Sequence, residues 1–158
     1  MMRIGLGYDL HRLAKERRFL LGGVIIPAKR GELGHSDGDV LAHAVCDAIL
    51  GAASLGDIGS LFPPSDPAWK DADSMELLRS VFGMVKQTGW RLINLDCVIR
   101  CEEPKILPFR DAICMSLAQV LEIPVDRVFV KGKTGEGVGP VGKGKAVEAL
   151  VVCLLEKD

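Results

Sequence analysis

The stretch GHSDGDVLAHAVCDAIL, residues 34–50, joins a polar loop to an apolar segment and decides how the chain folds. After Asp39 the apolar residues recur every three to four positions, which predicts an amphipathic helix. Ser36, Asp37 and Asp39 are all residue types that cap helix N-termini. The helix places His43 about one turn from its start. The apolar stripe that must pack against the core comprises Val40, Leu41, Ala44, Val45, Ala48 and Ile49.

The segments on both sides of this helix have the patterns of further strands and helices. Helices are expected over residues 74–86 and 108–121, where apolar residues again recur at helical spacing. The segment 146–155 is a continuous apolar run that could form a helix, but its Val, Leu and Cys content suits a central strand. The complete set of expected strands is 2–10, 18–27, 91–101, 125–131 and 146–155.

This order of elements predicts a single α+β domain over residues 1–158, built on a mixed β-sheet that helices cover on one face. The expected strands are apolar on both faces, so the second face of the sheet also needs a cover. Packing against other subunits is the natural candidate for that cover.

Composition excludes several classes of partner. The net charge is −1, so no basic field suggests nucleic acid. No apolar run approaches the roughly 18 residues that span a membrane, and the N-terminus lacks the pattern of a signal peptide. The cysteines are odd in number and form no CxxC pair, which favours buried free thiols in a reducing compartment and hence a cytoplasmic location. They are Cys46, Cys97, Cys101, Cys114 and Cys153.

Asp9 and His11 lie two positions apart near the end of the first expected strand. Residues two apart in a strand point to the same face, so both side chains can reach one atom. With His43 they would supply two imidazoles and one carboxylate, a set that leaves a fourth position open in catalytic zinc sites. The alternative is a polar strand end that meets water, with His43 an ordinary helix histidine.

Two further groups have the chemistry of phosphate sites. His35 and Ser36 precede the helix, where free backbone N–H groups attract anions. In the glycine-rich segment 132–145, Glu136 lies near Thr134 and could meet a hard divalent cation among phosphates. Each group also has a structural interpretation, as a turn and as a surface loop that carries one acidic charge.

Taken in order, these segments resemble the 2-C-methyl-D-erythritol 2,4-cyclodiphosphate synthase family over essentially the whole chain. The central motif from residue 35 to residue 67 is highly specific, and we know of no other family that combines it with an N-terminal GYDxH. The resemblance rests on RIGLGYDLHRL, LLGGVIIP, GHSDGDVLAHAVCDAILGAASLGDIGSLFPPSDP, DSMELLR, NLDCVI, EEPKILP and VKGKTGEGVG, at family spacing.

The resemblance implies two metal sites. Its zinc ligands fall on Asp9, His11 and His43, the trio that strand and helix spacing already suggest. Its second divalent cation, Mg²⁺ or Mn²⁺, falls on Glu136.

The resemblance also implies that His35 and Thr134 stabilise the transition state. Asp57 and its neighbours would hold the methylerythritol part of the substrate, whereas Lys105 and the loop around Thr134 would hold the cytidine and the phosphates. The full set of implied substrate contacts is Ser36, Asp57, Ile58, Gly59, Phe62, Pro63, Pro64, Ser65, Asp66, Cys101, Glu102, Glu103, Pro104, Lys105, Ile106, Leu107, Lys133, Gly135 and Lys143.

The family implies a CMP-releasing lyase of the non-mevalonate isoprenoid pathway. The 2-phosphate of 4-diphosphocytidyl-2-C-methyl-D-erythritol 2-phosphate attacks the β-phosphorus, closes an eight-membered ring and expels CMP. The family further implies a homotrimer whose sheets face the three-fold axis and whose active sites lie between subunits.

The glycine-rich segment departs from the common family pattern. Many members carry a run of threonines before the glutamate, whereas Lys133 and Gly135 flank Thr134 here. Many also carry an aromatic residue at the position of Pro140 and an arginine at that of Lys143, toward a central cavity that in some members holds an isoprenoid diphosphate. Lysine keeps the charge but lacks the bidentate fork of arginine. We therefore expect catalysis to carry over, but not isoprenoid binding.

Two other functions would use the same residues. A zinc phosphoesterase that activates a metal-bound water needs the same ligand trio. A non-catalytic trimer that binds a metal or a nucleotide would need it as well.

Overall fold

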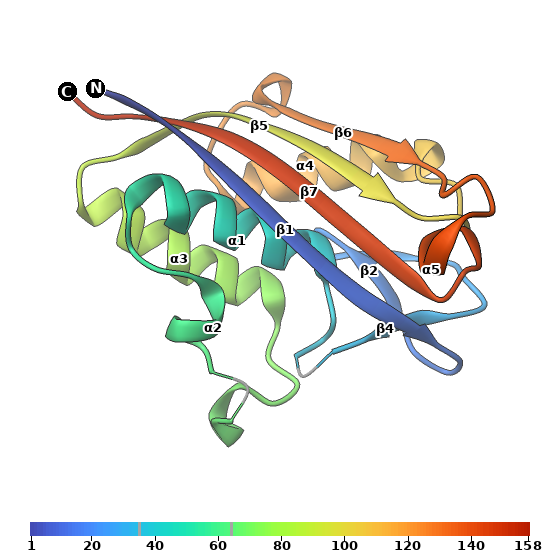
Figure 1. Cartoon of the computed structure of the whole chain (residues 1–158). Helices are drawn as coiled ribbons and strands as arrows, with labels where there is room; N and C mark the ends of the chain where they lie inside the picture. The colour runs from blue at the N-terminus through green and yellow to red at the C-terminus, as the bar shows by residue number, and fades with distance from the viewer. Residues whose placement is uncertain (35, 64) are drawn as a thin grey trace.

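Two long antiparallel strands from opposite ends of the chain form the centre of the sheet (Figure 1). Strand β1 (Met2–Ala14) pairs with β7 (Ala146–Glu156) along most of its length, so the two termini lie side by side. The computed structural model describes residues 1–34, 36–63 and 65–158.

The complete sheet has five strands in the order β4-β1-β7-β5-β6. The β5–β6 pair is parallel and the other pairs are antiparallel, so the sheet is mixed, as the sequence predicts. A separate two-stranded hairpin is formed by β2 and β3. The bounds of these strands are Phe19–Leu21 for β2, Val24–Ile26 for β3, Gly31–Leu33 for β4, Arg91–Arg100 for β5 and Val128–Lys133 for β6.

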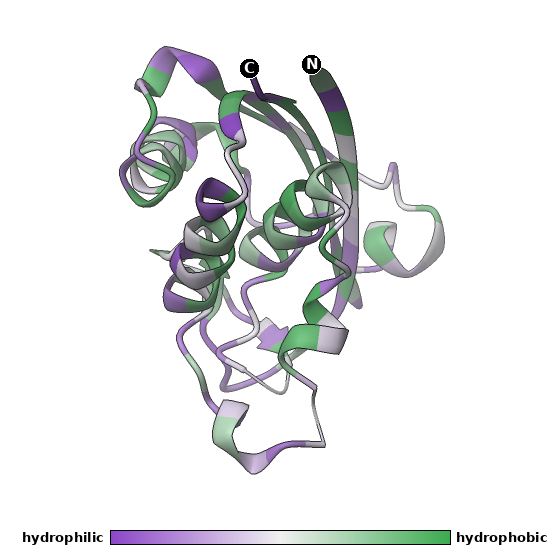
Figure 2. Ribbon diagram, turned by 90° about the vertical axis from the view of Figure 1, so that its left-hand side faces the viewer, coloured by the Kyte–Doolittle hydropathy of each residue, from purple (hydrophilic) through white to green (hydrophobic). Residues whose placement is uncertain are grey.

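Three longer helices pack on one face of the sheet: α1 (Val40–Ala53), α3 (Ser74–Gln87) and α4 (Arg110–Val120). Figure 2 shows the strands edge-on, with these helices on one side of them. The arrangement confirms the predicted α+β fold. In the described part of the chain, no helix has the length and hydrophobicity needed to cross a bilayer. The short helical turns are α2 (Ile58–Leu61), η1 (Pro67–Trp69), η2 (Leu107–Phe109), η3 (Val125–Arg127) and α5 (Gly139–Gly142).

Helix α1 approaches β1 closely because two glycines face it. A Cβ atom added to Gly7 would lie 1.8 Å from the carbonyl oxygen of Ala44, and one added to Gly5 would lie 1.9 Å from that of Ala48. The strand can therefore lie directly against the helix backbone only where it lacks side chains. The contact fixes the distance between the two elements that carry the candidate ligands.

The structure corrects the expected bounds of several elements. Segment 18–27 is a hairpin rather than one strand, because Gly22 and Gly23 adopt φ values of 57° and 78° and turn the chain. Strand β4 lies inside the expected loop 28–39 and pairs with the last residues of β1. The pairing with β7 and β4 extends β1 to Ala14, so Asp9 and His11 lie within the strand and not at its end.

The sheet face opposite the helices exposes apolar side chains of β1. Ile4 is 74% exposed, Leu6 68% and Tyr8 51%, and Val152 of β7 adds to the same face. From Gly5 to Leu13 the alternate residues of β1 are buried or half-buried toward the helices, as are Val147, Ala149, Val151, Cys153 and Leu155 of β7. The second face thus has the predicted apolar character along β1, whereas β5, β6 and β7 carry the ion pairs Arg100–Glu148 and Lys131–Asp96 on it.

Candidate metal centre

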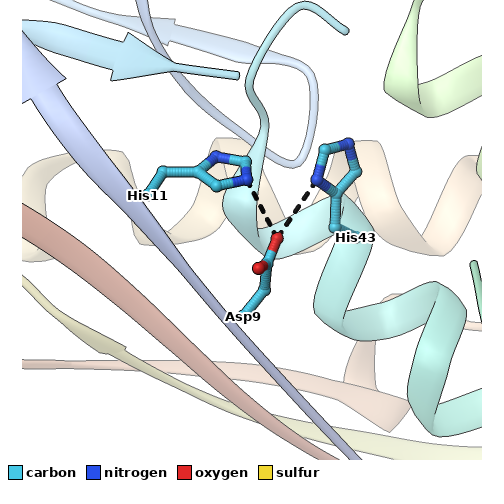
Figure 3. Close-up of side chains that lie close together, drawn as sticks. All are labelled: Asp9, His11 and His43. Atoms are coloured by element: carbon cyan, nitrogen blue, oxygen red, sulfur yellow. Dashed lines mark hydrogen bonds and ion pairs between the residues drawn. The ribbon is translucent and has the colours of Figure 1, made fainter. Parts of the chain in front are cut away.

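Three side chains from β1 and α1 converge on one point (Figure 3). The Oδ2 atom of Asp9 lies 3.0 Å from Nε2 of His11 and 3.1 Å from Nδ1 of His43. One ligand atom from each residue lies within 4.8 Å of the other two. Two imidazole nitrogens and a carboxylate oxygen at this spacing form a donor set that fits a zinc ion.

Strand alternation and helix position together explain why the three side chains meet. Asp9 and His11 share the face of β1 that Gly5 and Gly7 leave open to α1. His43 lies in the first turn of α1, whose N-terminus is capped by the Asp39 side chain through the backbone N–H of Ala42. Asp39 is thus the cap among the three candidates that the sequence offered.

Each histidine also has a polar partner for its other ring nitrogen. The Nδ1 atom of His11 donates to the carbonyl oxygen of Gly38 at 2.6 Å. The Nε2 atom of His43 lies 2.9 Å from the hydroxyl of Ser74 and 3.0 Å from that of Ser36. Such outer partners are typical of metal-ligating histidines, because they orient the ring and fix its tautomer.

The electrostatics of the cluster favour an ionised carboxylate. Burial disfavours the charge on Asp9, but the hydrogen bonds with His11 and His43 outweigh it and hold the pKa of Asp9 well below its usual range. Burial likewise disfavours the charged form of His11, yet Asp9 raises the pKa of that imidazole. The ionised Asp9 carboxylate thus favours positive charge beside it.

A cavity of about 260 Å³ opens in front of the cluster. Among the predicted substrate contacts, Ser36, Ile58, Gly59 and Phe62 line it. Asp57 does not line it, but caps α2 and thereby sets the position of Ile58 and Gly59. The structure therefore brings this part of the predicted site together.

The remaining predicted contacts in this loop lie further along the chain. Asp66 is exposed and caps the helical turn η1 through the backbone N–H of Ala68. Pro63 is half-buried, and Ser65 is exposed. His35 and Pro64 lie outside the described residues.

A second cavity, of about 290 Å³, lies between the end of β6 and the connector that follows β5. The backbone of Gly135 donates to the carboxylate of Glu102 at 2.9 Å, which ties the glycine-rich segment to this connector. The predicted contacts that line the cavity are Cys101, Pro104, Lys105, Ile106, Leu107, Lys133 and Thr134. Among these residues, the family resemblance implies that Lys105 and the loop around Thr134 hold the cytidine and the phosphates.

Thr134 and Glu136 lie close together; Thr134 is half-buried and Glu136 is exposed. The Thr134 hydroxyl donates to the Glu136 carboxylate at 3.1 Å, and Glu136 adopts a left-handed backbone with φ of 52°. Lys143 is exposed and lines another cavity with Lys29 and Glu103. Within the described residues, the cluster of potential metal ligands contains Asp9, His11 and His43 and does not include Glu136. One chain therefore does not bring the two predicted halves together.

The structure adds residues that the sequence interpretation missed. Trp69 and Leu77 line the cavity in front of the cluster. Ser74 contacts His43 directly, and Asp37 holds Ser74 through its hydroxyl and its backbone N–H. In the sequence, Asp73 and Ser74 at the start of the expected helix 74–86 indicate an N-cap. They do not indicate that Ser74 contacts a histidine on another helix.

The YgbB family model matches residues 2–156 of the chain. A curated relative from Treponema denticola, named 2-C-methyl-D-erythritol 2,4-cyclodiphosphate synthase, is 58% identical over 154 residues. The match covers 98% of this chain and 96% of the relative.

Two solved structures share the fold. A CDP-bound form of 2C-methyl-D-erythritol-2,4-cyclodiphosphate synthase matches with a TM-score of 0.90 at 41% identity, covering 98% of this chain and 100% of the other. Bifunctional IspDF from Campylobacter jejuni matches with a TM-score of 0.96 at 40% identity. That match covers 100% of this chain, which spans 43% of the bifunctional chain.

Proposed function

Because the chain belongs to the YgbB family, whose matched relatives are 2-C-methyl-D-erythritol 2,4-cyclodiphosphate synthases, we propose that Asp9, His11 and His43 form the zinc site of that reaction. The chain is a CMP-releasing cyclodiphosphate synthase of the non-mevalonate isoprenoid pathway. The observation that carries the zinc assignment is the convergence of three ligand atoms within 4.8 Å of one another.

The reaction is an intramolecular phosphoryl transfer. An oxygen of the 2-phosphate of 4-diphosphocytidyl-2-C-methyl-D-erythritol 2-phosphate bonds to the β-phosphorus. The bond from the β-phosphorus to the oxygen that bridges to the α-phosphate breaks, and CMP leaves with that oxygen. The attacking and receiving groups are both anionic, so the protein must position them and neutralise charge rather than supply a covalent nucleophile.

When bound, zinc at the cluster and Mg²⁺ or Mn²⁺ at Glu136 would supply positive charge to the phosphates. We assign Thr134, and His35 outside the described residues, to hydrogen bonds that stabilise the transition state. Ser36 and the segment from Asp57 to Phe62 would bind the methylerythritol part. The cavity in front of the metal cluster, which several of these residues line, supports that assignment.

The cytidine and the remaining phosphate contacts are assigned to the second cavity. Its lining by Lys105 and Lys133 supplies positive charge, and the backbone around Cys101 supplies donors and acceptors. CDP in the matched structure of the family is a ligand of the same class, which supports a nucleotide at this site.

We further propose that the protein is a homotrimer with its active sites between subunits. Two observations support this assembly: the apolar side chains exposed on the open sheet face, such as Ile4 and Leu6, and the separation of Glu136 from the metal cluster within one chain. A neighbouring subunit would supply the Thr134–Glu136 side of each site. All five cysteines are free and buried, as predicted, which supports a cytoplasmic location for the protein.

The function is tested by incubating the protein with the cytidylyl substrate, Zn²⁺ and Mg²⁺ and following the products by phosphorus NMR. We expect equal amounts of CMP and a cyclic diphosphate, and no reaction after chelation of both metals. Release of CMP together with an acyclic 2,4-bisphosphate would instead identify a phosphoesterase that uses water as the nucleophile.

A further inference from the structure

We propose that Asp47 is a positioning residue for the substrate, because it holds the backbone that carries the proposed methylerythritol contacts. Asp47 lies on α1, one turn after His43, and is half-buried. Its Oδ1 atom accepts a hydrogen bond from the backbone N–H of Ile58 at 2.8 Å. Asp47 is not among the residues assigned to the substrate or the metals. The inference rests on the function proposed for the cavity in front of the metal cluster.

The bond to Asp47 holds the first residue of a very short helix. Helix α2 has four residues, Ile58–Leu61, and the first backbone N–H groups of a helix have no partner within it. The Asp57 side chain accepts from the N–H of Ser60 at 2.7 Å, and Asp47 accepts from that of Ile58. Asp57 belongs to the same segment as α2, whereas Asp47 belongs to α1. The Asp47 bond therefore ties α2 to the helix that carries a metal ligand.

The same bond orients Asp57, because the Ile58 nitrogen belongs to the peptide group that joins the two residues. A peptide group is planar, so a hydrogen bond at its nitrogen restricts rotation of the whole group. The residues on the other side of this peptide, Ile58 and Gly59, line the cavity that the metal cluster also lines. One hydrogen bond to Asp47 thus sets both the cap of α2 and the start of the cavity wall.

Apolar contacts hold α2 near the core but do not fix its direction. Ile58, Leu61 and Phe62 are half-buried and pack against the core. Such contacts are non-directional, so they allow a short helix to rotate or to shift along α1. A hydrogen bond weakens steeply as its angle departs from linearity. The Asp47 side chain therefore supplies the direction that the apolar contacts lack.

This role requires an acceptor at Asp47 but not a negative charge. The phosphates of the substrate are anionic, so a carboxylate near them supplies no attraction. Asp47→Asn keeps an oxygen acceptor of nearly the same geometry, whereas Asp47→Ala and Asp47→Leu remove it. We therefore expect Asp47→Asn to preserve the position of α2 and the other two variants to lose it.

Two measurements are made on the wild type and on each variant, with Asp126→Ala as the matched control. Asp126 is exposed on η3 and lines neither of the two cavities assigned to the substrate. Amide hydrogen exchange reports how firmly the Ile58 N–H is bonded and does not depend on turnover. Steady-state kinetics give KM for the cytidylyl substrate, and inhibition by CMP reports the affinity of the other cavity.

For Asp47→Ala and Asp47→Leu we expect the Ile58 amide to exchange about tenfold faster or more, because a hydrogen bond to a carboxylate is lost. KM should rise about tenfold for the same reason. Turnover should also slow, since the methylerythritol part carries the attacking phosphate. The inhibition constant of CMP and the zinc dissociation constant should not change. Asp47→Asn should stay close to the wild type in each measurement, and Asp126→Ala should match it.

Each outcome decides the proposal. Unchanged exchange at Ile58 in Asp47→Ala would overturn it, and faster exchange with an unchanged KM would show that Asp47 serves stability alone. Equal losses in Asp47→Asn and Asp47→Ala would contradict the acceptor role, because the charge would then matter. If Asp47→Ala does not fold, as judged by circular dichroism, Asp47→Leu decides, and failure of both to fold would make Asp47 a folding residue instead.

The proposed function and the role of Asp47 can fail separately. A wild type that forms no cyclic product would refute the proposed function, whereas the exchange rates would still show whether Asp47 holds the Asp57–Ile58 peptide. A wild type that forms the product, with KM unchanged in Asp47→Ala, would leave the function standing and refute the role of Asp47.

Discussion

The two halves of the proposed active site differ in how one chain holds them. Asp9, His11 and His43 lie on a strand and a helix in direct contact, and the side chains of His11 and His43 are only 12% and 14% exposed. Thr134 and Glu136 lie in a loop after β6, and Glu136 is exposed. His11 and His43 thus have hydrogen-bond partners on other elements of the same chain. The hydrogen bonds described for the Thr134 and Glu136 side chains join these two residues to each other.

This difference indicates which half depends on assembly. The metal cluster is formed by contacts between β1 and α1 and needs no other subunit to exist. The Thr134–Glu136 loop is tied to the same chain by the bond from Gly135 to Glu102, but among the described residues it does not belong to the cluster of potential metal ligands. If the loop acts on a neighbour's cluster, changes in the two halves should have separable effects on zinc binding, turnover and assembly.

The largest effect is expected from removing a ligand of the metal cluster. Asp9→Ala and His43→Ala should each abolish measurable zinc binding, because two ligands do not hold the ion at neutral pH. Turnover should fall by about 10³-fold or more, since metal assistance of phosphoryl transfer contributes several kcal/mol. Zinc content by mass spectrometry and the rate of CMP release measure the two losses.

Size-exclusion chromatography with light scattering supplies the control for these variants. The proposed homotrimer should persist, because Asp9 and His43 lie on the helix-facing side of β1 and away from the open sheet face. A variant that unfolds or dissociates on losing one ligand would indicate a structural metal and would contradict a catalytic one.

A smaller loss is expected from the loop half. Glu136→Gln removes the charge proposed to bind the second cation, and we expect turnover to fall by about 10²-fold, as for other single groups that stabilise charge in a transition state. Zinc affinity should be unchanged, in contrast to Asp9→Ala. Steady-state kinetics at a series of Mg²⁺ concentrations, together with zinc competition, distinguishes this pattern from a general loss of folding.

The sequence predicted the elements that periodicity controls. Strand alternation placed Asp9 and His11 on one face, and the three-to-four spacing of apolar residues placed His43 on α1. These regularities are local, so they can be recognised without knowing the partners of each element. The hairpin at Gly22 was missed because its two glycines were treated as a break within one strand, although both turn the chain at positive φ.

The contacts between distant elements could not be predicted in the same way. Nothing in the local pattern indicates that Gly7 lies against Ala44, or that Ser74 at the start of α3 reaches His43. These contacts depend on how close two elements pack in three dimensions. The loop around Thr134 has no periodicity at all, and the sequence assigned its role through the family resemblance alone.

Zinc binding should also depend on pH in a way that reports on the first half only. Burial disfavours the protonated form of His11, but the neighbouring Asp9 carboxylate raises the pKa of the imidazole above its usual value. Zinc must displace this proton, so affinity should increase as pH rises and level off above the pKa of His11. Below that pKa, displacement of one proton weakens binding by about tenfold per pH unit.

The pH profile is measured by chelator competition on the wild type and on Glu136→Gln. The two profiles should coincide, because Glu136 is proposed to hold the second cation and is not among the zinc ligands Asp9, His11 and His43. A profile that is flat across the range in which imidazoles titrate would show that no ligand proton is displaced. A shift in Glu136→Gln would show that this carboxylate, from the same chain or from a neighbour, acts on the zinc ligands.

The smallest departure from the wild-type rate is expected when the two halves are damaged in different chains. In a random mixture of Asp9→Ala and Glu136→Gln chains, each site draws its cluster from one chain and its loop from another. About a quarter of the sites should then be intact and the mixture should recover that share of wild-type turnover, since neighbouring subunits are chosen independently. The variants are mixed by co-expression, and the rate of CMP release is compared with that of each variant alone.

Asp9→Ala mixed with His43→Ala is the control, because both changes damage the same half and no combination restores a complete cluster. If the Asp9→Ala and Glu136→Gln mixture turns over no faster than the average of the two variants measured alone, both halves must come from one chain, and the exposed loop would have to reach its own metal cluster by a rearrangement of β6.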